Sequence, residues 1–420
     1  MSGTKPGGRL DDEQLVDWLR LIRSENIGPR TFRQLINRYG GARLALEALP
    51  ELVSKTLRGR VIRLAERDEV LREIAVAHAS GVRFLASIDP DYPPLLREIA
   101  DAPPILAVRG DASATSRDAV AVVGSRNASA VGLTFAERLA RGLASANYVV
   151  VSGLARGIDA VAHRATLTTG TIAVLAGGHA RPYPSEHQKL ADEIAERGML
   201  ISEMPFDWEP RGRDFPRRNR LIAGVSRATV VVEAARRSGS LITAKFANDQ
   251  GREVFAVPGS PLDPRAEGAN DLLRQGANLC TRAEDVVELL SGSSPRAYPT
   301  DLFDATDETG GDEPLFDEID FFAAPRAVYA RAEAGPAPSF TAIGDPNFLQ
   351  GEHSETIVAT ERDPVGVIVS LLGPAPITIN ELVRVSGLTA QAVHGALVEL
   401  EIVGRIRRPG NDLVSLVYKQ

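Results

Sequence analysis

This 420-residue chain contains one cysteine, no long apolar run and no surplus of basic residues. With Cys280 alone, neither an intramolecular disulfide nor a cysteine-rich zinc site can form. No apolar run is long enough to span a bilayer, and residues 1–8 lack the hydrophobic region of a secretory signal. We therefore expect a cytoplasmic protein without a membrane segment, and the length predicts two or three domains.

The formal net charge of −7 argues at first against a nucleic-acid partner. Much of the acid, however, is concentrated in residues 301–320, which carry nine carboxylates and neither Lys nor Arg. The rest of the chain is close to neutral and has an arginine-rich stretch between residues 211 and 252. The distribution of charge, more than its total, decides whether a surface attracts DNA, so a nucleic-acid partner stays open.

Composition and hydrophobic period divide the chain into four predicted regions. Residues 1–86 form an N-terminal helical domain of the SAM or helix-hairpin-helix kind, and residues 87–290 form a Rossmann-like core. Residues 291–363, rich in Pro, Ala, Gly and acid, form a flexible acidic linker. Residues 364–420 form a winged-helix domain.

The N-terminal region has helical periodicity at residues 13–24, 31–39 and 61–80. Between the first two helices, the turn Ile27-Gly28-Pro29-Arg30 has two explanations. It offers backbone N–H groups to a phosphate, as helix-hairpin-helix modules do, or it only ends one helix and starts the next.

In the core, short Val- and Ile-rich runs alternate with helical segments. Regular alternation predicts an α/β fold with a parallel sheet covered on both faces. Right-handed crossovers place the loops after all of the strands along one edge. The predicted strands are 119–123, 148–151, 171–175, 199–202, 229–232 and 253–256. The predicted helices are 129–146, 157–168, 185–197, 217–225 and 241–250.

The C-terminal region has the order of helices and hairpin that is typical of a winged helix. The predicted segments are 365–372, 379–386, 389–401, 404–408 and 413–417. The candidate recognition helix, 389–401, has no Lys or Arg, although phosphate contact normally requires positive charge. This favours a protein-contact or structural role, while Arg405, Arg407 and Arg408 keep a DNA contact open.

Glycine-rich turns with a hydroxyl group or an arginine follow several of the predicted strands. Gly124-Ser125-Arg126 follows the first strand and residues 152–159 follow the second. Gly177-Gly178 and Ser238-Gly239-Ser240 follow two others. Turns of this kind open a helix, whose N-terminal N–H groups suit a phosphate.

An arginine cluster accompanies these turns, because residues 215–224 place Arg217, Arg218 and Arg220 against an apolar segment. An unpaired buried charge is costly, so these guanidinium groups need anionic partners. The partners are either internal carboxylates or a polyanion from outside, and the glycine-rich turns favour the polyanion. The candidate internal carboxylates are Glu203, Glu233 and Asp214.

Asp159 and His163 share one face of a predicted helix but do not predict chemistry. A metal pair would need a third ligand, which is missing nearby, and no nucleophile accompanies His163. We therefore expect no catalytic residue, no metal and no cofactor.

The ordered motifs, from Asp91-Tyr92-Pro93 to Val257-Pro258-Gly259, resemble the DNA-processing protein A (DprA/Smf) family over about residues 87–290. The resemblance implies a non-enzymatic homodimer that binds single-stranded DNA, protects incoming strands and loads the RecA recombinase during natural transformation. It also implies DNA contacts by Arg126, by Arg211 or Arg213, and by Phe215, with Lys189 as a further candidate.

Together, the turns, the arginine cluster and the resemblance give the predicted DNA-binding residues. These are Gly124, Ser125, Arg126, Ser152, Gly153, Arg156, Gly157, Lys189, Arg211, Arg213, Phe215, Arg217, Arg218, Asn219, Arg220, Ser238, Gly239 and Ser240.

Three other hypotheses accompany this interpretation. A nucleotide-processing enzyme of the phosphoribohydrolase type is the alternative, since Glu233 ahead of Ser238-Gly239-Ser240 resembles such sites. The arginine content exceeds what one mononucleotide needs. A sequence-specific regulator is disfavoured by the charge of the candidate recognition helix. The acidic linker, in addition, is a candidate autoinhibitor of the basic groove.

Overall fold

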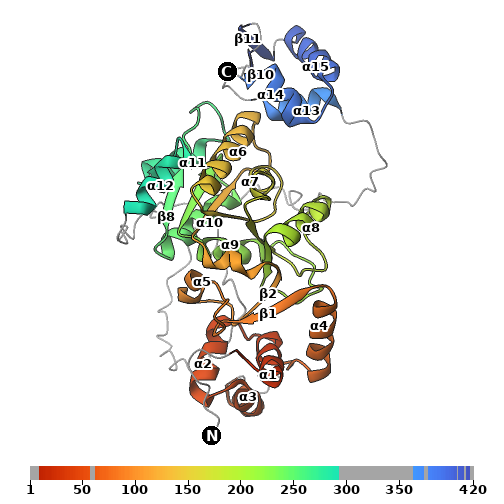
Figure 1. Ribbon diagram of the computed structural model, residues 1–420, viewed down its shortest axis with the longest axis vertical. Helices are drawn as coiled ribbons and strands as arrows, with labels where there is room; N and C mark the ends of the chain where they lie inside the picture. Colours follow the sequence, from red (N-terminus) through yellow and green to blue (C-terminus); the bar gives the residue numbers. More distant parts are fainter. Residues whose placement is uncertain are drawn as a thin grey trace, which may run out of the picture.

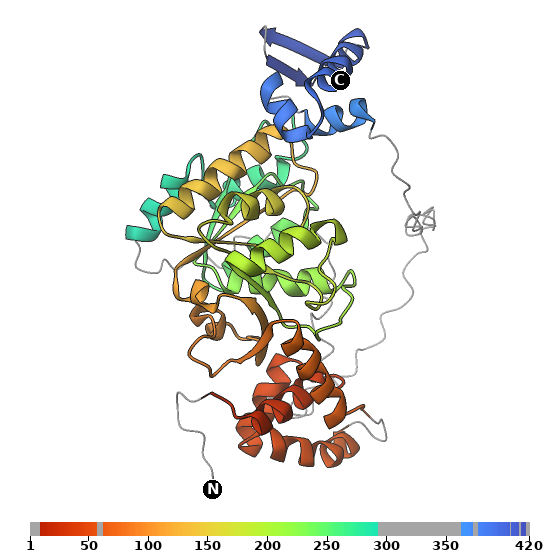
Figure 2. The same ribbon diagram turned by 45° about the vertical axis from the view of Figure 1, so that its right-hand side comes forward.

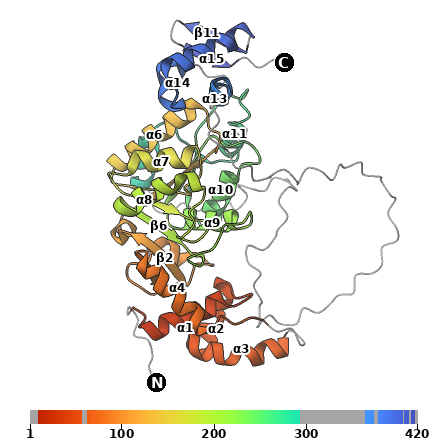
Figure 3. The same cartoon turned by 90° about the vertical axis from the view of Figure 1, so that its right-hand side faces the viewer.

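The computed structural model describes residues 9–56, 62–292, 363–372, 377–403, 405–410 and 413–416. Along the longest axis, an N-terminal helical body, a sheet-containing core and a small C-terminal body follow one another (Figure 1). The same order is visible after a quarter turn (Figure 3). The predicted acidic linker, and with it the autoinhibition hypothesis, falls almost wholly outside the described residues.

The core is built on a nine-stranded sheet with the order β1-β2-β6-β5-β4-β3-β7-β8-β9. All six predicted strands are present in it to within one residue, and they pair in parallel, which confirms the α/β class. They are β3 (Ala119–Gly124), β4 (Val149–Ser152), β5 (Thr171–Val174), β6 (Met199–Ser202), β7 (Ala228–Val232) and β8 (Glu253–Ala256). The other strands are β1 (Val82–Ala86), β2 (Ile105–Gly110) and β9 (Asn278–Leu279).

Helices cover both faces of the sheet, because alternate residues of each central strand are apolar on both sides. Val120 and Val122 face one core cluster and Ala121 and Val123 face another. The first face is covered by α6 (Ala130–Ser145), α7 (Ile158–Thr166) and α12 (Ala283–Gly292). The second is covered by α5 (Pro94–Glu98), α9 (Asp214–Gly224), α10 (Gly239–Asp249) and α11 (Glu267–Arg274). Helix α8 (Gln188–Arg197) packs on β5 and β6.

The N-terminal body consists of α1 (Asp12–Arg23), α2 (Pro29–Tyr39), α3 (Ala42–Thr56) and α4 (Arg67–Ala79). The helix predicted at 61–80 begins only at Arg67, where a capping box of Glu66 and Glu69 fixes its start. Strand β1 precedes the domain boundary predicted after residue 86, yet it pairs antiparallel with β2 in the core sheet. The two bodies therefore share apolar packing between α1 and β1.

The C-terminal body is a winged helix, as predicted. It comprises α13 (Pro364–Leu371), β10 (Ile377–Thr378), α14 (Ile379–Ser386), α15 (Ala390–Ile402), β11 (Ile406–Gly410) and β12 (Leu413–Leu416). It rests on the N-terminal half of α6 (Figure 2). Arg384 pairs with Glu137 at 2.6 Å, and Ala130 joins the apolar core of the winged helix. Throughout the described ranges, no helix has both the length and the hydrophobicity needed to cross a bilayer.

Candidate nucleic-acid interface

The loops that follow β3 and β4 pack backbone against backbone at the carboxyl edge of the sheet. A Cβ atom at Gly124 would lie 1.9 Å from the Val232 carbonyl oxygen, so only glycine fits at this position. Gly157 has φ +73°, and a Cβ there would lie 2.2 Å from the carbonyl oxygen of Ser125. This close packing fixes the loop that carries Arg126, whose side chain is exposed.

Arg126 belongs to a cluster of cations and aromatic rings around a small hollow. Its guanidinium group lies 5.4 Å from the centre of the Phe215 ring, and Tyr183 meets the same ring edge-on at 5.3 Å. Beside the hollow, the guanidinium group of Arg211 lies 4.9 Å from the Trp208 ring. Cations suit phosphates and exposed ring faces suit bases, so this surface has the chemistry for a single strand. The hollow is lined by Arg126, Gly153, Ala155, Arg156, Tyr183, Pro184, Phe215 and Arg218.

The two exposed arginines of the hollow differ in their partners. Within the described part of the chain, Arg126 forms no ion pair within 4 Å, whereas Arg156 makes two hydrogen bonds to Glu186 at 2.7 and 2.8 Å. The hydrogen bond and charge of Glu186 raise the pKa of Arg156. Both side chains are at least half exposed, and such surface pairs contribute little free energy. A phosphate can therefore replace Glu186 at small cost.

Arg217 and Arg220 are held by an internal carboxylate instead. Glu203 accepts a hydrogen bond from Arg217 at 2.9 Å and another from Arg220, whose side chain is 0% exposed. Burial pushes the pKa of Glu203 upward, but the charges and hydrogen bonds of the two arginines outweigh it and lower the pKa overall. A phosphate contact by Arg220 does not fit its position, because the guanidinium group is enclosed and neutralised. The scaffold explanation applies to both arginines.

Arg218 shapes the hollow from beneath. It is buried and donates to the carbonyl oxygens of Gly153, at 2.6 Å, and Val174. Burial lowers the pKa of Arg218 to about 10, and the charge of Asp159 acts in the opposite direction. The Asp159 carboxylate accepts from the N–H groups of Gly153 and Ala155, at 3.0 and 3.3 Å. These N–H groups are therefore not offered to a phosphate, contrary to the expectation for this turn.

Gly153→Ala is expected to lower the free energy of unfolding by about 1–3 kcal/mol, because a Cβ overpacks this site. The new atom would lie 2.7 Å from the Arg218 guanidinium carbon. Arg218 cannot move aside, because its two carbonyl contacts hold it. Urea denaturation measures the change, and Gly239→Ala is the control, since nothing lies within 4 Å of a Cβ there. Equal stabilities of the two variants would contradict this account.

Three family models match successive parts of the chain. Residues 83–291 match "DNA recombination-mediator protein A", residues 12–76 match "DprA-like N-terminal HHH domain", and residues 358–411 match "DprA winged helix domain". The protein Smf of Synechocystis is 32% identical over 338 residues, which is 78% of this chain and 79% of that protein. The chain belongs to the DprA/Smf family.

Other DprA/Smf proteins match between about half and two thirds of the chain. The DNA processing protein DprA of Bacillus subtilis is 41% identical over 222 residues, 52% of this chain and 75% of that protein. Protein Smf of Escherichia coli is 46% identical over 202 residues, 47% of this chain and 54% of that protein. The X-ray structure of DprA from Streptococcus pneumoniae covers 67% of this chain and 98% of its own, with TM-score 0.56 and 30% identity.

The remaining predicted residues of this DprA/Smf core do not line the hollow. Ser152 is buried, and its hydroxyl group donates to the Val122 carbonyl oxygen at 2.7 Å. Asn219 is also buried and donates to the Gly239 carbonyl oxygen at 3.1 Å. Lys189 lies on α8 with a side chain that is 90% exposed. Ser152 and Asn219 therefore stabilise the DprA/Smf scaffold, and neither fits a direct contact with a strand.

Ser238, Gly239 and Ser240 lie on the other side of β3, because they follow β7, which pairs with β3 opposite to β4. There the Glu233 carboxylate accepts from the Ser129 N–H group at 2.8 Å, at the N-terminus of α6. None of these three residues lines the hollow, although Gly239 accepts the hydrogen bond of Asn219, the neighbour of Arg218. In this DprA/Smf chain the open cluster lies on the β4 side.

Tyr183 and Trp208 were not among the predicted site residues. Tyr183 is 51% exposed beside Phe215, and the Tyr183-Pro184 pair after Gly177-Gly178 was a signal that could have identified it. Trp208 lies in the loop between β6 and α9. No motif marked it, because its role depends on the position of Arg211.

Buried His163 does not provide a general acid at this surface. Burial lowers the pKa of His163 to about 3, so the ring is neutral, and its Nδ1 lies 2.8 Å from the Thr171 hydroxyl group. Among the residues that the structure describes, no group of three His, Cys, Asp or Glu side chains could hold a metal ion.

Proposed function

We propose that this protein binds single-stranded DNA without reading its sequence. The observation that carries the proposal is the open cluster of Arg126, Phe215 and Tyr183 at the carboxyl edge of the sheet. Arg126 and Arg156 would contact phosphates, and the exposed Tyr183 ring and the half-buried Phe215 ring would stack on bases. Stacking and phosphate contacts do not distinguish one base from another, so binding would be independent of sequence.

The resemblance to the DprA/Smf family extends the proposal to cellular function. The protein would act in the cytoplasm as a homodimer, protect incoming strands and load RecA onto them, without catalysing a reaction itself. The winged helix would contact a protein partner, because the described exposed face of α15 includes Gln391, His394 and Glu399 and no Lys or Arg. A RecA strand-exchange assay with and without the protein tests the loading step.

The direct test is a fluorescence-anisotropy titration with single-stranded and double-stranded oligonucleotides of equal length. Single strands should bind more tightly, and the logarithm of the affinity should fall with the logarithm of salt concentration. If Arg126, Arg156 and Arg211 each displace a counterion, the slope should be roughly −2. Equal binding of both forms, or binding that does not depend on salt, would contradict the proposal.

The phosphoribohydrolase alternative depends on Glu233. Burial raises the pKa of this carboxyl group, as a catalytic acid requires, although hydrogen bonds from Ser129 oppose the rise. Those bonds also direct the carboxylate into the N-terminus of α6. Incubation with nucleoside monophosphates should therefore release no free base. Base release that disappears in Glu233→Gln would establish the alternative.

Tyr183→Ala should weaken single-strand binding by about 1–3 kcal/mol, because one stacking surface is removed. Tyr183→Phe keeps the ring and should bind like the wild type, since the proposal assigns no role to the hydroxyl group. Anisotropy at one fixed salt concentration measures both. If Tyr183→Phe loses as much as Tyr183→Ala, the ring does not act by stacking.

A further inference from the structure

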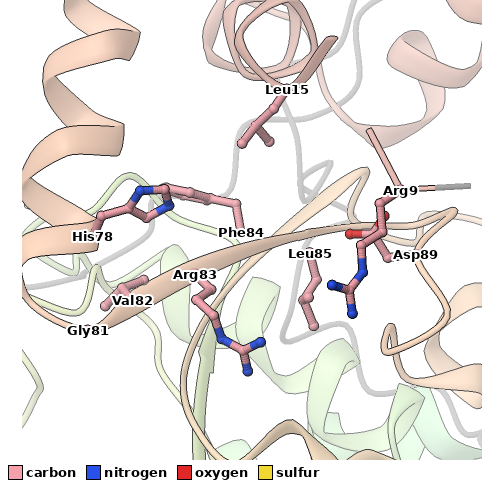
Figure 4. A pocket seen from close by; sticks show the side chains of 9 residues that line it. All are labelled: Arg9, Leu15, His78, Gly81, Val82, Arg83, Phe84, Leu85 and Asp89. Carbon is pink, nitrogen blue, oxygen red and sulfur yellow. The ribbon is translucent and has the colours of Figure 1, made fainter. Parts of the chain in front are cut away.

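A groove of about 510 Å³ lies between the N-terminal helices and the sheet (Figure 4). Leu15 of α1 and His78 of α4 line it from the helical body, and Phe84 lines it from β1. The His78 and Phe84 rings lie 6.3 Å apart. The groove is remote in sequence from every residue of the DNA-binding cluster, so it needs its own explanation.

The groove runs along the free edge of β1. It is lined by Val82 and Phe84, which point to one face of the sheet, and by Arg83 and Leu85, which point to the other. A hollow that touches both faces of one strand must follow that strand's edge. Among the described residues β1 is the terminal strand of the sheet and pairs with β2 alone. The backbone N–H and C=O groups of Ala86 are already bonded to Asp89, so the part of the edge that is left to another strand is the stretch from Val82 to Leu85.

The polar groups of the groove suit an entering acidic segment. Arg83 is exposed and makes no ion pair within 4 Å in the described ranges, whereas Arg9, at the other end of the groove, pairs with Asp91 at 2.5 Å. Asp89 is buried; its Oδ2 accepts the Ala86 N–H group at 2.8 Å, while its Oδ1 has no partner. A buried unpaired oxygen calls for a donor, and the backbone N–H of an added strand is one.

We propose that the edge of β1 binds an extended acidic and apolar segment, and that the occupant is residues 301–320 of the same chain. These residues combine nine carboxylates with Leu302, Phe303, Leu315, Phe316 and Ile319. The carboxylates complement the unpaired charge of Arg83, and the apolar side chains complement Leu15 and Phe84. Strand addition supplies main-chain hydrogen bonds, while alternate side chains enter the groove.

The tether permits this contact. The chain is described up to Gly292, and Leu315 follows about 23 residues later, which spans up to about 75 Å when extended. Because the segment and the groove belong to one chain, their effective concentration is about millimolar for a tether of this length, so a weak site is still occupied. The proposal does not rest on DNA binding.

Cysteine cross-linking in the full chain tests the occupant. Arg83→Cys and Phe316→Cys are combined and treated with a short bismaleimide, and the products are mapped by peptide mass spectrometry. Thr168→Cys replaces Arg83→Cys in the control, because Thr168 is exposed and lies in the connection between α7 and β5. Burial raises the pKa of Cys280 to about 12, so the native thiol does not compete.

We expect the intrachain product with Arg83→Cys to form at least tenfold faster than with Thr168→Cys. Neutralising the segment with Asp317→Asn, Glu318→Gln and Asp320→Asn should abolish that difference and speed hydrogen exchange at β1. Equal rates, or products joining two chains that vanish on dilution, would overturn the proposal. The second result would identify a second copy as the occupant.

Discussion

Glu203→Ala is expected to lower the free energy of unfolding by about 3–5 kcal/mol, the largest effect of any single change considered for this chain. Without the carboxylate, Arg220 keeps a guanidinium group that is 0% exposed and loses the charged hydrogen bond to Glu203, while the Asp101 carboxylate stays at the longer distance of 3.6 Å. A buried charge that loses its main partner is far more costly than the pair is favourable. Chemical denaturation with circular dichroism measures the change.

The matched control is Glu186→Ala, which also removes the carboxylate of an arginine pair. Because Glu186 and Arg156 are at least half exposed, the free energy of unfolding should change by less than about 1 kcal/mol. Similar losses in both variants would mean that burial does not decide the effect.

The loss in Glu203→Ala should also depend on pH. The folded-state pKa of Glu203 lies below its ordinary value, so its stabilising effect is present above the unfolded-state pKa. That contribution is lost as the pH falls through the folded-state pKa. The difference between wild type and variant should therefore be largest near neutrality and shrink in acid. A difference that grew on acidification would contradict the assigned ion pairs.

Arg126→Ala should weaken single-strand binding about 10- to 100-fold at moderate salt, as expected for a phosphate contact that also positions an aromatic ring. The side chain is exposed and pairs with no carboxylate among the described residues, so its charge is available to a phosphate. The salt slope should become shallower by about 0.7, the value for one phosphate contact on a single strand. Anisotropy titrations over a range of salt concentrations measure both quantities.

Arg236→Ala is the control for charge alone. Arg236 lies at the same edge of the sheet, is 65% exposed and pairs with Glu267 and Asp271 at 3.5 and 3.3 Å. Its removal should change affinity by less than about twofold, since a neutralised surface arginine contributes little. If both variants lost the same affinity, the overall electrostatic field of the protein would explain binding, and the cluster around Arg126 would not.

The sequence predicted the parallel core well because its strands are continuous apolar runs between helices, a pattern with one physical solution. Antiparallel β1 and β2 were missed. Arg83 interrupts the apolar pattern of β1, and β2 is followed by no helix of the βαβ kind. Helix α3 was missed as well, and Pro50 lies inside it, which weakens any helical signal. The start of α4 was placed too early, since its capping box was not recognised.

For the candidate site, residue types were predicted better than roles. The turn at Gly124 and the choice of Arg126 follow from loop chemistry, which is local in sequence. The neighbouring sequence does not show which arginines are buried in ion pairs and which face solvent. Arg220 pairs with Glu203, which lies outside its helix, while Arg126 faces solvent. Three arginines in one run therefore look alike in sequence although their surroundings differ. Tyr183 joins Phe215 only through the fold.

The docking of the winged helix on α6 complicates any salt titration of the intact chain. The contact includes the pairs Arg384–Glu137 and Arg138–Glu381, at 2.6 and 3.6 Å, which dissolved ions screen. Rising ionic strength therefore weakens the contact between the winged helix and α6. At the same time it weakens the binding of phosphates. Part of the measured dependence of affinity on salt would then come from movement of the winged helix. Energy transfer between one fluorophore on the winged helix and one on the core measures that movement separately.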